Sequence, residues 1–317
     1  MNTFYFLVQQ TMFFFIPLMI VALGGMFSES SGIINIALEG IMVIGAFFGL
    51  LFVSLNQDTM TGQSLLIIAM LISIVVGIIF SLFHAFASIN LKADQTISST
   101  ALNMFAPAFC IFAARVVQDV QQISFRNTFR IEKVTWFGDI PIVGKMFFQN
   151  TYITTYIGIA ILIISSIILY RTKFGLRLRS CGENPQAAES VGISVYKIRY
   201  AGVILSGALA GLGGIVYVIP TSTNFNATVS GYGFLALAVL IFGQWKPWKI
   251  LLAALFFGVM KTLAAAYSGI PFFLKINIPD TFYKILPYVA TLIVLSFTSR
   301  KSHGPVAAGI PYDKGAR

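Results

Sequence analysis

The chain has 317 residues, of which 57% are hydrophobic and only 10% are charged, and its mean hydropathy is +0.85. Soluble domains carry roughly 25% charged residues, so this composition excludes a soluble globular protein and indicates a polytopic membrane protein. The formal net charge of +10 does not indicate a nucleic-acid-binding protein, because the basic residues lie in the loops between apolar segments, where membrane proteins place them.

Apolar segments of membrane-spanning length recur along the whole chain. A hydrocarbon core about 30 Å thick takes about 20 apolar residues per helix. No Lys or Arg precedes Lys92, so the first segment lacks the basic start of a cleavable signal peptide and is expected to remain as a membrane helix. We predict an all-α, polytopic membrane protein of about eight to ten helices, with residues 1–299 as the transmembrane domain. The predicted spans are residues 4–27, 33–55, 64–83, 97–117, 151–170, 200–220, 230–245, 250–267 and 282–298.

Two long polar segments interrupt the spans and set the predicted orientation. Residues 118–150 carry charged and aromatic side chains and are expected to form an ordered external loop. Residues 171–199 contain six Lys or Arg against two acids, and placing them in the cytoplasm puts thirteen basic residues inside and seven outside. The N-terminus is then external, and residues 300–317 form a cytoplasmic tail that is expected to be partly disordered.

The basic loop contains a short helix with its own start and stop signals. Asn184 is a good N-cap, and Pro185 suits the first helical position, where its missing N–H is no loss. Gly192 can close the helix in the left-handed conformation. One or two helical turns do not persist alone in water, so the sequence predicts that this helix is held by a partner and serves as a docking surface.

The second predicted span carries two polar residues four positions apart. Asn35 and Glu39 are expected to share one face of a helix. An ionisable side chain inside a membrane span is a functional candidate by default, so both residues are candidates for the substrate path. The alternative, which the sequence leaves open, places Glu39 near the cytoplasmic interface, where it caps or hydrates a helix start.

Glycines spaced four apart occur in the second and sixth predicted spans. Gly45 and Gly49 form one GxxxG pair, and Gly207 and Gly211 form the other. Such pairs let two helix backbones approach closely, so these four residues are predicted helix-packing positions. A seam between subunits or a gate is the alternative.

The sequence offers little raw material for catalysis. It contains no P-loop with the required spacing, and its two His and two Cys are scattered. We therefore expect a transport protein that does not hydrolyse ATP by itself and holds no metal or other cofactor.

Three stretches, taken together in this order, resemble the permease subunits of ABC importers that handle simple sugars, nucleosides and branched-chain amino acids. The resemblance covers roughly residues 20–300, and its motifs look most like the nucleoside and simple-sugar permeases that work with basic-membrane-protein-type binding lipoproteins. The stretches read SGIINIALEGIMVIGAFFG, FGLRLRSCGENPQAAESVGISVYKIRYAGVILSGALAGLGG and SGYGFLALAVLIFGQWKPW.

This resemblance implies a set of partners and a role for the basic loop. The short helix would be the coupling helix that docks into a cytoplasmic ATPase subunit, which carries the ATP and magnesium. A second permease, expected to be a paralogue, and an extracellular substrate-binding lipoprotein complete the expected complex in the lipid of a bacterial inner membrane. The residues that match the coupling motif are Glu183, Asn184, Pro185, Ala187, Ala188 and Gly192.

The resemblance also orders the candidate substrates. Nucleosides, and purine nucleosides first, are the expected cargo, with simple sugars as the alternative and branched-chain amino acids third. A secondary transporter is a rival from another class, but it would be expected to carry ionisable pairs in mid-membrane. Only Glu39 and Lys261 are available here.

Overall fold

The computed structural model describes residues 2–60, 62–267 and 304–314, together with six isolated positions between 279 and 292. Within these residues, seven helices are long and apolar enough to cross a membrane, and an eighth apolar helix is shorter. This confirms the predicted all-α, polytopic class. The long helices are α1 (Asn2–Ser30), α2 (Leu38–Asn56), α3 (Gln63–Ala85, continued by the π-helical turn Phe86–Asn90), α4 (Gln95–Gln118), α5 (Ile153–Arg171), α8 (Val195–Thr221) and α10 (Pro247–Ala266), and the shorter one is α9 (Tyr232–Phe242).

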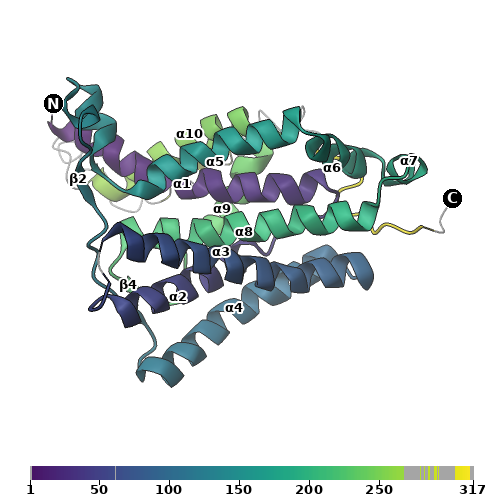
Figure 1. The fold of residues 1–317 in the computed structure, drawn as a ribbon, viewed down its shortest axis with the longest axis horizontal. Helices are drawn as coiled ribbons and strands as arrows, with labels where there is room; N and C mark the ends of the chain where they lie inside the picture. Colours follow the sequence, from purple (N-terminus) through teal and green to yellow (C-terminus); the bar gives the residue numbers. More distant parts are fainter. Residues whose placement is uncertain are drawn as a thin grey trace.

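The helices lie side by side along the long axis of the molecule (Figure 1). The N-terminus and the short strands lie at one end, and α6 (Lys173–Glu183), α7 (Pro185–Ser190) and the C-terminus lie at the other. We call these the N-terminal end and the basic end. The centre is formed by α1, which packs against α8, α9 and α10, and by α8, which also packs against α2 and α3. Over their membrane-length stretches, 61% of α1 and 72% of α8 is buried.

The four predicted packing glycines lie at contacts between helices of this chain. A Cβ on Gly45 would lie 2.6 Å from the Cα of Gly211, so α2 and α8 touch backbone to backbone there. A Cβ on Gly207 would meet the backbone of Gly77 in α3 at 2.6 Å, and one on Gly49 would meet α3 at 3.0 Å from a backbone carbonyl. Only glycine allows helix axes to come this close.

The segment of residues 118–150, predicted to be an external loop, is ordered by two short antiparallel strand pairs. Strand β1 (Ile123–Ser124) pairs with β4 (Asn224–Phe225), which follows α8, and β2 (Ile131–Lys133) pairs with β3 (Gln149–Thr151). A 3₁₀ turn (Phe137–Asp139) and a π-helical turn (Gly144–Phe148) lie between β2 and β3. The expectation of an ordered loop over residues 118–150 is therefore confirmed.

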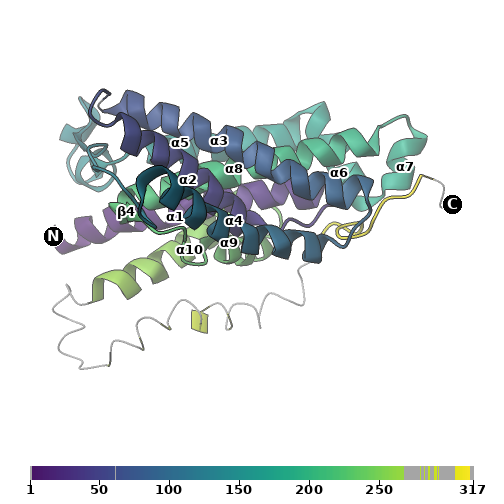
Figure 2. The same ribbon diagram turned by 90° about the horizontal axis from the view of Figure 1, so that it is seen from below.

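Three sequence expectations differ from the structure or lie outside it. The second span does not begin at residue 33, because residues 31–37 are not helical and α2 starts at Leu38. The tail is not disordered over residues 304–314, which pack onto the basic end (yellow in Figure 2). The ninth predicted span, residues 282–298, lies outside the described residues apart from isolated positions.

Candidate functional site

The chain between α1 and α2, residues 31–37, is a break in the membrane helices, and polar side chains satisfy its backbone. The Ser28 hydroxyl donates to the Ile33 carbonyl at 2.7 Å, and the Ile34 N–H donates to Gln95 Oε1 at 2.7 Å. His84 Nε2 lies 3.0 Å from the Ile34 carbonyl, so this nitrogen carries the proton and donates. Unsatisfied backbone groups cost several kcal/mol in hydrocarbon, which explains why buried polar residues gather here.

Asn103 and Asn35 fix the remainder of this break. The Asn103 amide donates to the Ile36 carbonyl at 3.0 Å and accepts from the Gly40 N–H at 2.8 Å. Asn35 is fully buried and donates to the Ser206 hydroxyl of α8 at 2.9 Å. Residues 31–37 are thus bonded to α3, α4 and α8 at once, and their path is determined by contacts that are distant in sequence.

The prediction that Asn35 and Glu39 share one helical face is wrong. Asn35 lies before the helix, in the non-helical segment, whereas Glu39 lies in the first turn of α2. The two side chains contact different elements, because Asn35 binds α8 and Glu39 binds the start of α9.

Glu39 caps the N-terminus of α9. One carboxylate oxygen accepts from the Gly231 N–H at 2.9 Å, and the other accepts from the Gly233 N–H at 2.6 Å. Gly231, the cap residue of α9, has no side chain that could do this. The first N–H groups of a helix have no partner inside it and carry the positive end of the helix dipole. Glu39 therefore caps a helix start, as the sequence alternative held, but the helix is α9 and not its own.

Aromatic rings and a cation lie next to this cap. The rings of Tyr217 and Tyr232 have centroids 3.9 Å apart, and Lys261 Nζ lies 5.4 Å from the Tyr232 centroid. Tyr232 is 1% exposed, and its hydroxyl has no hydrogen-bond partner among the described residues. The interior near Glu39 thus holds a carboxylate, an ammonium group and two aromatic faces. Whether Asn35 and Glu39 line a substrate path stays a prediction.

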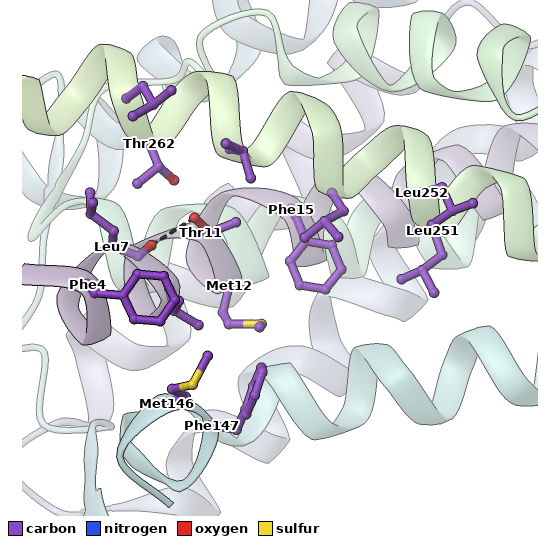
Figure 3. A pocket seen from close by; sticks show the side chains of 14 residues that line it. Phe4, Leu7, Thr11, Met12, Phe15, Met146, Phe147, Leu251, Leu252 and Thr262 are labelled. Carbon is purple, nitrogen blue, oxygen red and sulfur yellow. Dashed lines mark hydrogen bonds between the residues drawn. The ribbon is translucent and has the colours of Figure 1, made fainter. Parts of the chain in front are cut away.

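A separate cavity of about 500 Å³ lies between α1, α10 and the π-helical turn at residues 144–148 (Figure 3). Its walls are apolar except for two threonines. Thr11 donates its hydroxyl to the Leu7 carbonyl at 2.8 Å, and Thr262 donates to the Gly258 carbonyl at 2.8 Å. With these hydroxyls already bonded, the groove suits an acyl chain or an apolar helix and does not suit a polar solute.

At the basic end, α7 has the predicted start and stop. Asn184 Oδ1 accepts from the Ala187 N–H at 3.0 Å, and Pro185 occupies the first turn. After the helix, Gly192 has a φ of +82°, and the Ile193 N–H donates to the Ala188 carbonyl at 3.1 Å. This is the left-handed closure that glycine favours.

The six residues of the predicted coupling motif do not share one face. Pro185 and Ala188 are buried against the protein, and Ala188 packs with Cys181, Val195 and Tyr312. The exposed members are Glu183, Asn184, Ala187 and Gly192. Val191, which the motif did not include, is 74% exposed and adds an apolar side chain to that outer face. The ATPase-coupling role of these residues stays a prediction.

Glu183 also lines a pocket of about 310 Å³ at the basic end. Arg179 and Lys246 line the same pocket, together with Trp245, whose indole N–H donates to Glu29 at 2.6 Å. Among the described residues, no three His, Cys, Asp or Glu side chains are grouped as metal ligands. The pocket has charged walls of both signs and no sign of catalysis.

Sequence reasoning missed the partners of the predicted residues. The motif Gly231-Tyr232-Gly233 could have indicated a helix start in need of a cap, because its glycines offer N–H groups and no side-chain acceptor. The buried Arg199 and the tail residue Tyr312 gave no comparable signal, since each resembles a loop residue near a membrane boundary.

Comparison with known proteins agrees with this architecture. The chain is 42% identical over 313 residues to the guanosine ABC transporter permease protein NupQ of Bacillus subtilis, covering 98% of this chain and 97% of that protein. It is 41% identical over 314 residues to the nucleoside ABC transporter permease protein NupC of Lactococcus lactis, covering 99% and 98%. It is 29% identical to NupB, another nucleoside ABC transporter permease protein of that organism, over 80% of this chain and 72% of that protein.

A family profile covers almost the whole chain as well. It is described as "Branched-chain amino acid transport system / permease component" and matches residues 7–295. With seven membrane-length helices among the described residues, the chain is a multi-pass protein of the cytoplasmic membrane. It is a transport component and not an enzyme. The chain belongs to this family of ABC transporter permease components.

Proposed function

We propose that this chain is a permease subunit of an ATP-driven importer of nucleosides, with guanosine and related purine nucleosides as its cargo. The observation that carries the proposal is identity of 42% and 41% over nearly the full length of two permeases named for guanosine and for nucleosides. A putative glucose ABC transporter permease of Haloferax volcanii is less similar to this chain, at 28% identity over 296 residues, so simple sugars are the weaker candidate.

The outer face of α7 is the proposed contact with the ATPase subunit. A helix of six residues cannot hold itself in water, yet α7 leaves Ala187 exposed, and Val191, which directly follows it, is exposed as well. Exposed apolar side chains of this kind suit a protein cleft with apolar walls. Since the sequence has no P-loop, the ATP must be hydrolysed on that partner.

A second permease and a binding lipoprotein complete the proposed complex. NupB and NupC are both nucleoside ABC transporter permease proteins of Lactococcus lactis, and this chain is more similar to NupC. This supports a pairing with a paralogue that resembles NupB. The lipoprotein would deliver the nucleoside to the N-terminal end, where the strand-paired loop 118–150 is exposed.

In the proposed mechanism, binding and hydrolysis of ATP displace α7, and the helices shift between an outward-open and an inward-open arrangement. Asn35 and Glu39 lie where helices are interrupted, as the sites of many transporters do. Glu39 would hold α9 against α2 during the cycle. The chain supplies the path, and the ATPase supplies the free energy.

Uptake by cells that lack and regain this permease tests the proposed cargo. We expect deletion to abolish uptake of radiolabelled guanosine, and the restored chain to recover it. Excess inosine should compete with guanosine, whereas excess ribose and leucine should not. Competition by ribose alone would replace the nucleoside with a simple sugar, and uptake that persists without the ATPase subunit would indicate a secondary transporter.

Co-purification tests the partners independently of the cargo. The tagged chain, extracted gently from its own membrane, should carry a P-loop ATPase and a second permease that mass spectrometry identifies. An ATPase without a second permease would indicate a homodimer. Absence of the ATPase under conditions that preserve related complexes would contradict the proposed role of α7.

A further inference from the structure

The C-terminal segment 304–314 lies across the basic end and is bonded to two separate elements through its backbone. The Ala307 N–H donates to the Gly182 carbonyl of α6 at 2.8 Å, and the Gly309 N–H donates to the Gly32 carbonyl at 3.2 Å. Gly32 belongs to the break between α1 and α2. One stretch of the tail therefore bridges the basic loop and residues 31–37. The tail is drawn in yellow at this end of the molecule in Figure 2.

The same segment is bonded to α7. The Tyr312 hydroxyl donates to the Glu189 carboxylate, and Lys314 Nζ lies 3.5 Å from Glu189 Oε1. Burial and the neighbouring Glu189 carboxylate raise the pKa of Tyr312 to about 12, so the phenol stays protonated and remains a donor. Glu189 lies in the last turn of α7 and thus receives both a hydrogen bond and an ion pair from the tail.

Contacts with α8 and with the α3–α4 connection hold the segment in place. The Arg199 guanidinium of α8, which is 1% exposed, donates from Nη1 to the Ile310 carbonyl at 3.1 Å and lies 5.8 Å from the Tyr312 ring centroid. Asp313 pairs with Lys92 at 3.0 Å. Because α8 is a central helix, the segment is tied to the bundle as well as to α7.

We propose that residues 304–314 are a strap that couples α7 to residues 31–37, and that Tyr312 and Lys314 are positioning residues for transport. The inference rests on the proposed docking of an ATPase at α7. The strap grips α7 at Glu189 and the break at Gly32, three positions before Asn35. A displacement of α7 then reaches the segment that leads into Glu39 and, through it, the start of α9.

The double variant Tyr312→Phe, Lys314→Gln removes the hydrogen bond and the ion pair between the strap and Glu189 of α7, and it keeps the ring that packs against Tyr196 and Arg199. The matched control is Tyr200→Phe, which removes a hydroxyl that donates to Asn90 at 2.6 Å on the same end of α8, outside the strap. Both are measured in the full transporter with its ATPase, second permease and binding protein in proteoliposomes, as guanosine imported per ATP hydrolysed.

We expect import per ATP to fall at least about fivefold in the double variant, the lower end of typical coupling between sites, while ATP hydrolysis continues. The control should keep the wild-type ratio. A wild-type ratio in the double variant would overturn the strap. Should the double variant not assemble, Glu189→Ala removes the acceptor of both contacts from the side of α7, and an unchanged ratio in that assembled variant overturns the proposal equally.

A measurement that needs no cargo separates this inference from the proposed function. Hydrogen exchange of the full transporter is compared with and without ATP and vanadate. In the wild type, we expect exchange to change in peptides over residues 185–190 and over residues 31–37. In the double variant, exchange should still change over residues 185–190 but no longer over residues 31–37. If the wild type imports no guanosine, the nucleoside assignment fails. If exchange over residues 31–37 still changes in the double variant, the proposed strap is contradicted.

Discussion

Helices α7 and α9 are both short, and in both a side-chain oxygen caps the first turn, but the two caps have opposite origins. The cap of α7 is Asn184, the residue that directly precedes it, on an exposed surface. The cap of α9 is Glu39, which is 192 positions from Gly231 and belongs to another helix. The cap of α7 is therefore local to its own segment, whereas the cap of α9 is present only while α2 is in place. A local cap such as that of α7 suits a helix that moves. A distant cap such as that of α9 suits a contact that fixes two helices, α2 and α9, together.

The largest expected effect comes from removing the distant cap of α9. Glu39→Ala leaves the N–H groups of Gly231 and Gly233 without their acceptor, and each buried unsatisfied donor costs about 1–3 kcal/mol. We expect the free energy of unfolding to fall by about 2–6 kcal/mol, measured by thermal unfolding of the purified protein in detergent.

Glu39→Gln is the matched control for that variant, because the amide keeps one acceptor oxygen. It should lose less stability, assemble normally and still impair transport. An alanine variant as stable as the wild type would show that the carboxylate does not cap α9.

The closure of α7 can be tested with a pair of glycines. Gly192 and Gly62 have φ values of +82° and +73°, and a Cβ would have open space at each. Alanine should cost about 1–2 kcal/mol of strain at Gly192 and at least as much at Gly62, whose ψ of −153° lies in a region that essentially only glycine adopts. Gly62 lies at the N-terminal end, so only Gly192→Ala should reduce transport. Equal loss of transport in both variants would mean that the effect is general destabilisation.

The local cap of α7 should have a smaller effect that is confined to its own helix. Asn184→Ala removes the acceptor for the Ala187 N–H and should destabilise α7 by about 1 kcal/mol, seen as faster hydrogen exchange over residues 185–190. Asn184→Ser keeps a capping oxygen and should restore protection. Thermal stability of the bundle should not change, and a large loss in Asn184→Ala would show that α7 is not independent.

The smallest expected effect comes from Pro185. Pro185→Ala frees the backbone of the unfolded chain and should cost about 0.4–1 kcal/mol, again confined to α7. Transport should fall less than in Asn184→Ala. A larger loss would show that the buried ring of Pro185 carries packing that its position at the helix start does not explain.

The same contrast explains what could be predicted from the sequence. The long apolar runs and the punctuation from Asn184 to Gly192 are local signals, and the structure shows both as expected. The polar residues 28–32 do predict an interruption between the first two spans, but its extension to residue 37 has no local signal, because Ile33, Ile34 and Ile36 continue the apolar pattern of the span. What interrupts the helix there is a set of side chains from α3, α4 and α8 that offer better partners.

Long-range partners account for the other misses. Asn35 and Ser206 are 171 positions apart, and Tyr312 and Glu189 are 123 apart. A polar tail with glycine and proline has the composition of a disordered segment. Its order depends on a surface of α6, α7 and α8 that exists only after the bundle has formed.

The glycine contacts among α2, α3 and α8 limit how this permease can change shape. Where backbone meets backbone, no side chain can change rotamer to let one helix slide past the other. These three helices are therefore expected to move together as one block. The same argument extends to α1, because a Cβ on Gly202 would lie 2.9 Å from the Phe27 carbonyl, and to the start of α9, because a Cβ on Gly233 would meet the backbone of Glu39. Alternating access in this fold would then come from motion around this block and not from helices sliding within it.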